Sequence, residues 1–173
     1  RRSGVQMGKF CQEAELLPLP DGAADEVIAE FERIRNSNGG IKPHDLRVQM
    51  QETMTENVGV FRTDETMSKA IDDIAELRAQ FEKVQIEDKG RCFNTDLLET
   101  WELGCLLELA EVTAVSAHAR KESRGGHARD DFQKRDDANW LKHTMCFKED
   151  EGGYRLDYKP VIIGRYEPKE RVY

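Results

Sequence analysis

Hydrophobic residues recur every three or four positions over much of residues 21–120, a spacing that predicts amphipathic helices. The first helix is expected after Asp21, a plausible N-cap. Its apolar face consists of Val27, Ile28, Phe31 and Ile34. Residues 36–40, which are rich in asparagine and glycine, predict a stop. Pro43 then stands at the favoured first-turn position of a second helix. Its apolar residues are Leu46, Met50, Met54 and Val58.

Two longer helices are predicted further along the chain. A third helix is expected to start near Thr63, with an apolar stripe on one face and charges on the other. The stripe consists of Met67, Ala70, Ile71, Ile74, Leu77, Phe81 and Val84. Asn94 or Thr95 can cap a fourth helix that runs to about Arg120. Residues 103–117 are apolar or small on nearly every side, which predicts that this helix lies inside a bundle or is covered by another domain.

The other segments lack a helical period. Residues 1–20 end in two closely spaced prolines, so we expect them to be irregular. Residues 121–139 hold many charges and a glycine pair, which indicates a loop. Residues 143–163 alternate around a turn at 151–153, a pattern typical of a hairpin, until Pro160 favours an extended tail.

These patterns predict a mainly α fold. We expect a bundle of three to four helices, followed by a charged loop, a small β-hairpin and an extended C-terminal tail. The corresponding division is a connecting segment at 1–20, a helical bundle at 21–122, and the loop, hairpin and tail at 123–173. With 173 residues, of which 38% are hydrophobic, the chain is long enough to bury a core.

Composition narrows the classes of partner. The net charge of −8 argues against a nucleic-acid-binding protein, because such proteins usually carry a basic face. No apolar run approaches the ~18 residues that a membrane span requires, so we expect no direct membrane insertion. The four cysteines form no Cys-x-x-Cys pair, which favours reduced thiols over a metal or iron–sulfur site.

The chemically unusual stretch is residues 120–132, which follow directly on the most apolar helix. Its cations suit the negative end of the helix dipole, at ~0.3–1 kcal/mol each, and the glycine pair suits a helix C-cap. In a second interpretation, Arg124 and Arg129 donate two parallel hydrogen bonds each and lock the loop against a neighbouring domain. The available carboxylate partners are Asp130, Asp131, Asp136 and Asp137.

No catalytic or metal motif accompanies this loop. No second histidine lies at ligand spacing from His127, which favours a structural role for it over metal binding or base catalysis. Ser123 lacks the Gly-x-Ser-x-Gly frame of a nucleophile elbow. Gly125 and Gly126 match neither common phosphate-loop frame. From the residues alone, the chain is a helical module with one exceptional charged loop.

Two segments of this region carry a resemblance to a known family. They are residues 119–132, Ala-Arg-Lys-Glu-Ser-Arg-Gly-Gly-His-Ala-Arg-Asp-Asp-Phe, and residues 135–144, Arg-Asp-Asp-Ala-Asn-Trp-Leu-Lys-His-Thr. Both look like the C-terminal domain of succinate dehydrogenase and fumarate reductase flavoprotein subunits. Residues 1–4 resemble the point where the FAD-binding part of these subunits ends, so 1–20 would connect to a missing FAD-binding domain.

Three details refine the resemblance. L-aspartate oxidase shares the Glu-Ser-Arg-Gly-x-His core, so its C-terminal domain is an alternative, as is that of fumarate reductase. The tail, with Tyr-Lys-Pro-Val at 158–161 and Arg-Val-Tyr at 171–173, is more similar to succinate dehydrogenase. Gln133 stands where the family usually has proline, a departure that would loosen the turn.

The resemblance implies a parent enzyme that oxidises succinate to fumarate with FAD. The flavin-attachment histidine and the catalytic residues belong to the family's N-terminal part, so we expect no catalytic residue, bound FAD, metal or activity in this chain alone. By the same resemblance, Arg124 and Arg171 support flavin attachment. The residues expected to pack against the FAD domain are Glu122, Ser123, Gly125, Gly126, His127, Arg129 and Asp130.

The resemblance also implies partners and a location. The expected partners are the FAD-binding domain of the same subunit, an iron–sulfur subunit and a flavinylation assembly factor. The expected location is peripheral, on the cytoplasmic side of the inner membrane or in the mitochondrial matrix. The alternative from the residues alone is a free-standing helical interaction module that docks through residues 103–117.

Overall fold

The computed structural model describes residues 2–149, 152–166 and 168–169. It divides into two compact units, Arg1–Arg33 and Ile34–Tyr173. The first unit contains helix α1 (Arg2–Glu13), so the expectation of an irregular 1–20 segment was wrong. The helix ends at Glu13, before Pro18 and Pro20, and it buries no residue.

Helix α2 (Asp25–Asn36) begins four residues after Asp21, because residues 21–24 form a turn. Ile34 is the one described residue of this helix that is fully buried. The predicted helix is therefore confirmed, but Asp21 is not its N-cap.

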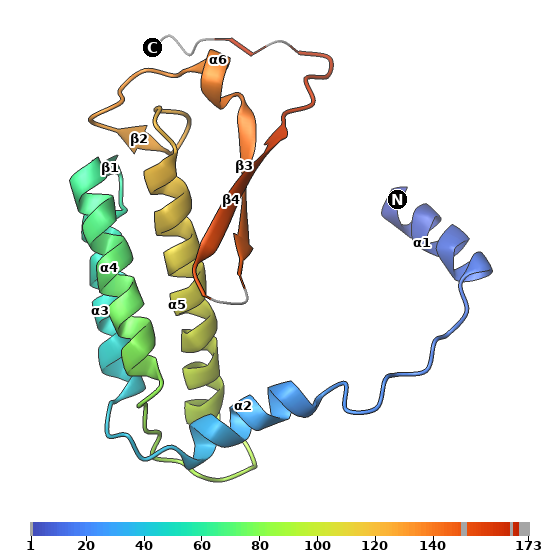
Figure 1. Ribbon diagram of the computed structural model, residues 1–173. Coiled ribbons are helices and arrows are strands. Elements are labelled where there is room, and N and C mark those ends of the chain that lie inside the picture. The colour runs from blue at the N-terminus through green and yellow to red at the C-terminus, as the bar shows by residue number, and fades with distance from the viewer. Residues whose placement is uncertain (1, 150–151, 167, 170–173) are drawn as a thin grey trace. The chain divides into compact units, whose positions relative to one another are not determined.

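The second unit is built on three neighbouring helices: α3 (Pro43–Asn57), α4 (Asp64–Phe81) and α5 (Thr95–Ala119) (Figure 1). Helix α4 packs against both of the others. The predicted starts are confirmed. Pro43 opens α3, Thr63 exchanges capping hydrogen bonds with Thr66 at the start of α4, and the Asn94 side chain accepts from the Leu97 N–H at the start of α5.

The core lies between these helices. Its largest cluster includes Ile34, Leu46, Met50, Ile74, Leu77, Phe81, Leu103 and Leu107. Gly104 lets α5 approach α4 closely, because a Cβ atom there would lie 2.9 Å from the Phe81 ring. One side of α5 stays open: Leu98 is 48% exposed and Leu109 is 61% exposed. The described residues thus cover only part of the helix that the sequence marked as apolar all round.

A two-stranded antiparallel hairpin lies beside α5 (Figure 1). It pairs β3 (Lys142–Lys148) with β4 (Tyr154–Pro160), with Cys146 opposite Leu156. The Tyr154 hydroxyl donates to Glu111 Oε2 of α5 at 3.2 Å and so holds the hairpin to the bundle. The predicted mainly α fold with a small hairpin is confirmed. Among the described helices, none is long and apolar enough to cross a membrane.

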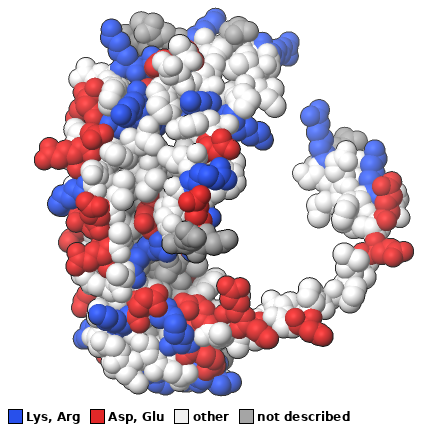
Figure 2. Space-filling model, in the orientation of Figure 1, with Lys and Arg blue, Asp and Glu red and all other residues white. Residues whose placement is uncertain are grey.

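Three short elements of the second unit were not predicted. Strand β1 (Phe61–Arg62) pairs in parallel with β2 (Ala128–Arg129) and ties the charged loop to the segment before α4. Helix α6 (Asp137–Trp140) is a single turn inside the predicted loop, capped by the Asp136 side chain. Basic side chains gather near these elements at the upper end of the molecule, whereas acidic ones follow the flank formed by the helices (Figure 2).

Candidate functional site

The charged turn between α5 and α6, residues 120–137, is held by a buried carboxylate. Glu122 is 0% exposed, and both of its oxygens accept hydrogen bonds. Arg124 donates to them in parallel from Nε at 2.8 Å and from Nη2 at 3.0 Å. Arg120 Nη1 and the Asp136 backbone N–H donate as well, the latter at 2.9 Å. Glu122 is therefore the centre of the turn.

The electrostatics of Glu122 follow from these contacts. Burial by itself raises the pKa of Glu122, but the hydrogen bonds from Arg124, the Asp136 backbone and Arg120 outweigh it and hold the pKa below its usual value. The bonds to Glu122, followed by those to Asp137, raise the pKa of Arg124. The Glu122 carboxylate and the Arg124 guanidinium are thus ionised at neutral pH.

Arg129 is the second anchor and is only 1% exposed. It binds both oxygens of Asp131, from Nε at 2.7 Å and from Nη2 at 2.6 Å. Its Nη1 donates to the carbonyls of His118 at 3.0 Å and Arg120 at 3.3 Å. These carbonyls lie at the C-terminal end of α5, where the helix itself supplies no donors, so Arg129 helps to cap that end.

Asp131 connects the turn to a second helix. Its Oδ2 accepts from the Asp64 backbone N–H at 2.9 Å, at the first residue of α4. The Asp130 backbone N–H donates to the Arg62 carbonyl at 2.9 Å, which extends the β1–β2 pairing. The turn is therefore fastened to the end of α5 and the start of α4 together.

His127 is held at both ring nitrogens. Nδ1 lies 2.8 Å from Arg62 Nη1, and Nε2 lies 3.0 Å from the Arg120 carbonyl. Because arginine can only donate and a carbonyl can only accept, this is the neutral ring with its proton on Nε2. Burial, and then the charges of Arg62 and Arg129, lower the pKa of His127 against the opposing bond to Arg120. The described residues contain no cluster suited to a metal ion.

The remaining predicted residues occupy different places. Ser123 Oγ accepts from the Arg129 N–H and donates to the Phe132 carbonyl, both at 2.8 Å. Gly125 takes the left-handed conformation that glycine favours, with φ of 59°, and Gly126 faces open space. The Asp130 side chain is exposed, and Arg171 lies outside the described residues.

The arginine–aspartate prediction was correct in part. Arg129 pairs with Asp131 as expected, and Arg124 contacts Asp137 at 2.6 Å. The partner that accepts two bonds from Arg124 is Glu122, which was not among the predicted acceptors. The signal was available, since Glu122 is the one acidic residue between Arg120 and Arg124.

Acid should weaken this turn. The bonds from Arg129 lower the pKa of Asp131 to about 2 against the effect of burial. The unfolded value is about 3.9, so the contribution to stability is complete above about pH 4 and is lost as the pH falls through about 2. We expect the unfolding free energy of Asp131→Asn, measured by urea denaturation, to decrease less than that of wild type as the pH falls from about 4 to about 2. Asp72→Asn, an exposed change on α4, should keep the wild-type slope. Equal slopes for Asp131→Asn and wild type would contradict the assignment.

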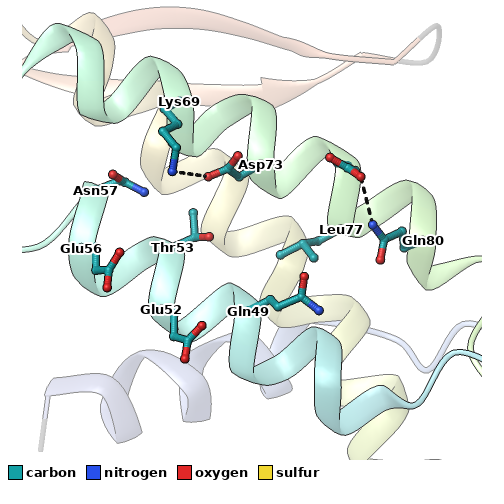
Figure 3. Close-up of a pocket in the computed structure, with 10 residues that line it drawn as sticks. Gln49, Glu52, Thr53, Glu56, Asn57, Lys69, Asp73, Leu77 and Gln80 are labelled. Atoms are coloured by element: carbon teal, nitrogen blue, oxygen red, sulfur yellow. Dashed lines mark hydrogen bonds and ion pairs between the residues drawn. The ribbon is translucent and has the colours of Figure 1, made fainter.

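A separate polar groove of about 290 Å³ runs between α3 and α4 (Figure 3). Glu52 and Glu56 line it from α3, and Lys69 and Asp73 line it from α4. Lys69 Nζ contacts Asp73 Oδ2 at 3.2 Å, and Gln80 bonds Glu76 at 3.1 Å. This groove brings together none of the candidate site residues predicted from the sequence.

Comparison with known proteins places the turn in a family. The family model described as "Fumarate reductase flavoprotein C-term" matches residues 47–173. The chain belongs to this family of flavoprotein C-terminal domains. The matched segment of this chain includes α4, α5, the charged turn and the hairpin. The resemblance noted from residues 119–144 is therefore confirmed.

This flavoprotein C-terminal domain is similar both to succinate dehydrogenase flavoprotein subunits and to fumarate reductase flavoprotein subunits. It is 42% identical over 146 residues to a succinate dehydrogenase flavoprotein subunit of Rickettsia bellii, covering 84% of this chain and 24% of that protein. It is 48% identical over 155 residues to a fumarate reductase flavoprotein subunit of Escherichia coli, covering 88% and 26%. A structure of Escherichia coli quinol fumarate reductase matches with a TM-score of 0.83 at 44% identity, covering 88% and 26%. The domain spans about a quarter of these relatives.

Proposed function

We propose that this chain is the C-terminal part of a succinate dehydrogenase flavoprotein subunit and supports its FAD-binding part. In the parent reaction, succinate is oxidised to fumarate while a hydride passes to FAD, and the electrons then pass to an iron–sulfur subunit and a quinone. Membership of the flavoprotein C-terminal family carries the proposal. The tail residues 158–161, Tyr-Lys-Pro-Val, favour the dehydrogenase within that family.

In this proposal the chain contributes rigidity rather than catalytic groups. A turn with a fully buried Glu122 and Arg129 keeps one shape, because moving either charge would leave its partners unpaired. Gly125 and Gly126 give this turn an open backbone surface that another domain can approach closely. Arg124 and Arg171 support flavin attachment, and the chain alone neither holds FAD nor oxidises succinate.

The exposed apolar side of α5 is a second contact surface in the same proposal. Leu106 and Leu109 line a groove of about 330 Å³ together with Met50 and Met54 of α3. Apolar side chains gathered on one face are typical of surfaces that another domain covers. Here the occupant is the FAD-binding part of the same subunit.

The wider assembly follows from the same proposal. The parent subunit would contact an iron–sulfur subunit and a flavinylation assembly factor, and would reach the membrane only through partner subunits. Its place would be the cytoplasmic side of the inner membrane or the equivalent matrix face. The described helices, none of which could cross a membrane, are compatible with such peripheral binding.

Fumarate reductase is the second candidate. The observation in its favour is the 48% identity to the Escherichia coli fumarate reductase subunit, against 42% for the Rickettsia bellii dehydrogenase. Succinate dehydrogenase and fumarate reductase catalyse the same interconversion of succinate and fumarate in opposite directions. Assays of the purified enzyme for quinone-coupled succinate oxidation and quinol-coupled fumarate reduction distinguish them by the faster direction.

The flavin-support role is tested in the full-length subunit with Arg124→Ala. We expect this variant to lose most covalent flavin, measured by flavin fluorescence in denaturing gels, because Glu122 and Asp137 lose their shared donor. Residues 1–173 alone should show no flavin absorbance band after incubation with FAD. Arg155→Ala, on the exposed hairpin, should keep wild-type flavin content. Unchanged flavin and melting temperature in Arg124→Ala would argue against the role.

A further inference from the structure

A hollow of about 490 Å³ lies over the C-terminal end of α5, next to the charged turn. Its described lining includes four cations, Arg62, Arg120, Arg124 and Lys142, and contains no aspartate or glutamate. In a chain with a net charge of −8, such a gathering of one sign is unusual. The attraction that these cations exert on a ligand depends on how many of them are already paired with carboxylates of the same chain.

Two of the four cations are already paired. Arg120 and Arg124 share the buried carboxylate of Glu122, and Arg124 also contacts Asp137. Together these four groups carry no net charge, and Arg135, which also binds Asp137, does not line the hollow. They shape the hollow but leave little attraction for an outside ligand.

The other two cations have no carboxylate partner among the described residues. Arg62 donates to the carbonyls of Val58 and Gly59 and to His127, all of which are neutral. Lys142 Nζ lies 3.9 Å from the ring centroid of Tyr158 and 4.9 Å from that of Trp140. Aromatic faces hold an ammonium group in place without cancelling its charge. The hollow therefore presents about two uncompensated positive charges on positioned side chains.

These charges stand on different elements. Arg62 belongs to β1 and Lys142 begins β3, and Figure 1 shows these strands on either side of the end of α5. Ala117 and Leu141 add apolar lining to the hollow. A lone inorganic anion would leave this apolar lining uncovered, whereas acidic side chains on a polypeptide cover it with their methylene groups and backbone.

We propose that the hollow receives a pair of carboxylates from an acidic segment of the FAD-binding part of the same polypeptide. This inference rests on the proposed function and names the chemistry of the contact. Carboxylates supply the two negative charges that Arg62 and Lys142 lack, and Arg62 still has a guanidinium nitrogen, Nη2, with no bond to a described residue. The contact fixes the register of the two domains through charge complementarity.

Zero-length cross-linking tests the contact directly in the full-length subunit. A water-soluble carbodiimide condenses a lysine amine with a touching carboxylate, forming an amide with net loss of water. We expect mass spectrometry to find Lys142 joined to an aspartate or glutamate outside residues 1–173. The product should be lost in Lys142→Arg, which keeps the charge without the reactive amine. It should also decline in about 1 M salt, where the screening length is about 3 Å.

Lys69 is the internal control for the variants, because it contacts Asp73 in the groove between α3 and α4 and should link within the chain in wild type and variants alike at low salt (Figure 3). Arg62→Gln should reduce the Lys142 product severalfold while leaving the Lys69 product unchanged.

The outcomes separate this inference from the proposed function. If other lysines of residues 1–173 link to the FAD-binding part and Lys142 does not, the inference fails and the support role stands. If Lys142 links only within residues 1–173, the inference also fails. If no lysine of the chain links to the remainder of the subunit, the support role itself fails.

Discussion

Replacing Glu122 with glutamine should lower the free energy of unfolding by about 3 kcal/mol, which corresponds to a fall in melting temperature of about 6–12 °C. The substitution keeps the shape of the side chain but removes the charge that Arg120 and Arg124 share. The lower end of the range for a broken buried pair applies, because the Arg124 side chain is 29% exposed and can recover some hydration. Thermal and urea denaturation measure the loss.

Glu76→Gln is the matched control for this prediction. Glu76 lies exposed on α4 and accepts a single hydrogen bond from Gln80 at 3.1 Å. An exposed change of this kind alters stability by less than about 0.5 kcal/mol. If Glu122→Gln is as stable as Glu76→Gln, the buried carboxylate does not hold the turn.

Replacing Arg129 with methionine should cost about 2–4 kcal/mol of unfolding free energy. Methionine fills much of the space but removes the donor to Asp131 Oδ1 and to the His118 carbonyl, and it leaves Asp131 Oδ2 and the Arg120 carbonyl with one donor fewer. Because this donor caps α5 and links it to the start of α4, amide hydrogen exchange should rise first at residues 61–62 and 128–129. Urea denaturation gives the magnitude and exchange gives the location.

Two further variants make the Arg129 prediction specific. Arg129→Lys keeps the charge but cannot donate two parallel bonds, so its stability should fall between those of wild type and methionine. Arg155→Met removes an arginine whose nearest carboxylate contact is 3.7 Å on the exposed hairpin, and it should change little. Equal losses for Arg129→Met and Arg155→Met would show that burial of Arg129 is not what matters.

The helices of the bundle could be predicted because each is amphipathic and begins at a recognisable cap. Pro43, Thr63 and Asn94 all stand where the sequence placed them, and the apolar stripes of α3 and α4 supply most of the core. The hairpin could be predicted from the alternation of apolar and polar residues on either side of Gly152 and Gly153, whose φ angles are 93° and 87°. In these segments the local preferences and the tertiary packing favour the same structure.

The turn could be predicted only in outline. Its arginines were recognisable as two-bonded donors, but the choice of Glu122 over nearby aspartates depends on burial, which sequence spacing does not encode. Strand β1 is too short to show a period and forms only because residue 128 returns to it. Helix α1 was missed because the prediction extended the helix-breaking effect of Pro18 and Pro20 to the whole 1–20 segment.

The parallel pairing of β1 with β2 has a consequence for the order of folding. Arg62 and His127, which meet at this junction, are 65 positions apart in the chain, and the helices between them must be in place before the two can meet. Closing so long a loop is entropically costly, so we expect the junction to assemble after the α4–α5 pair and to open before it. Newly made protein would then pass through a stage in which the bundle exists and the charged turn is still unformed.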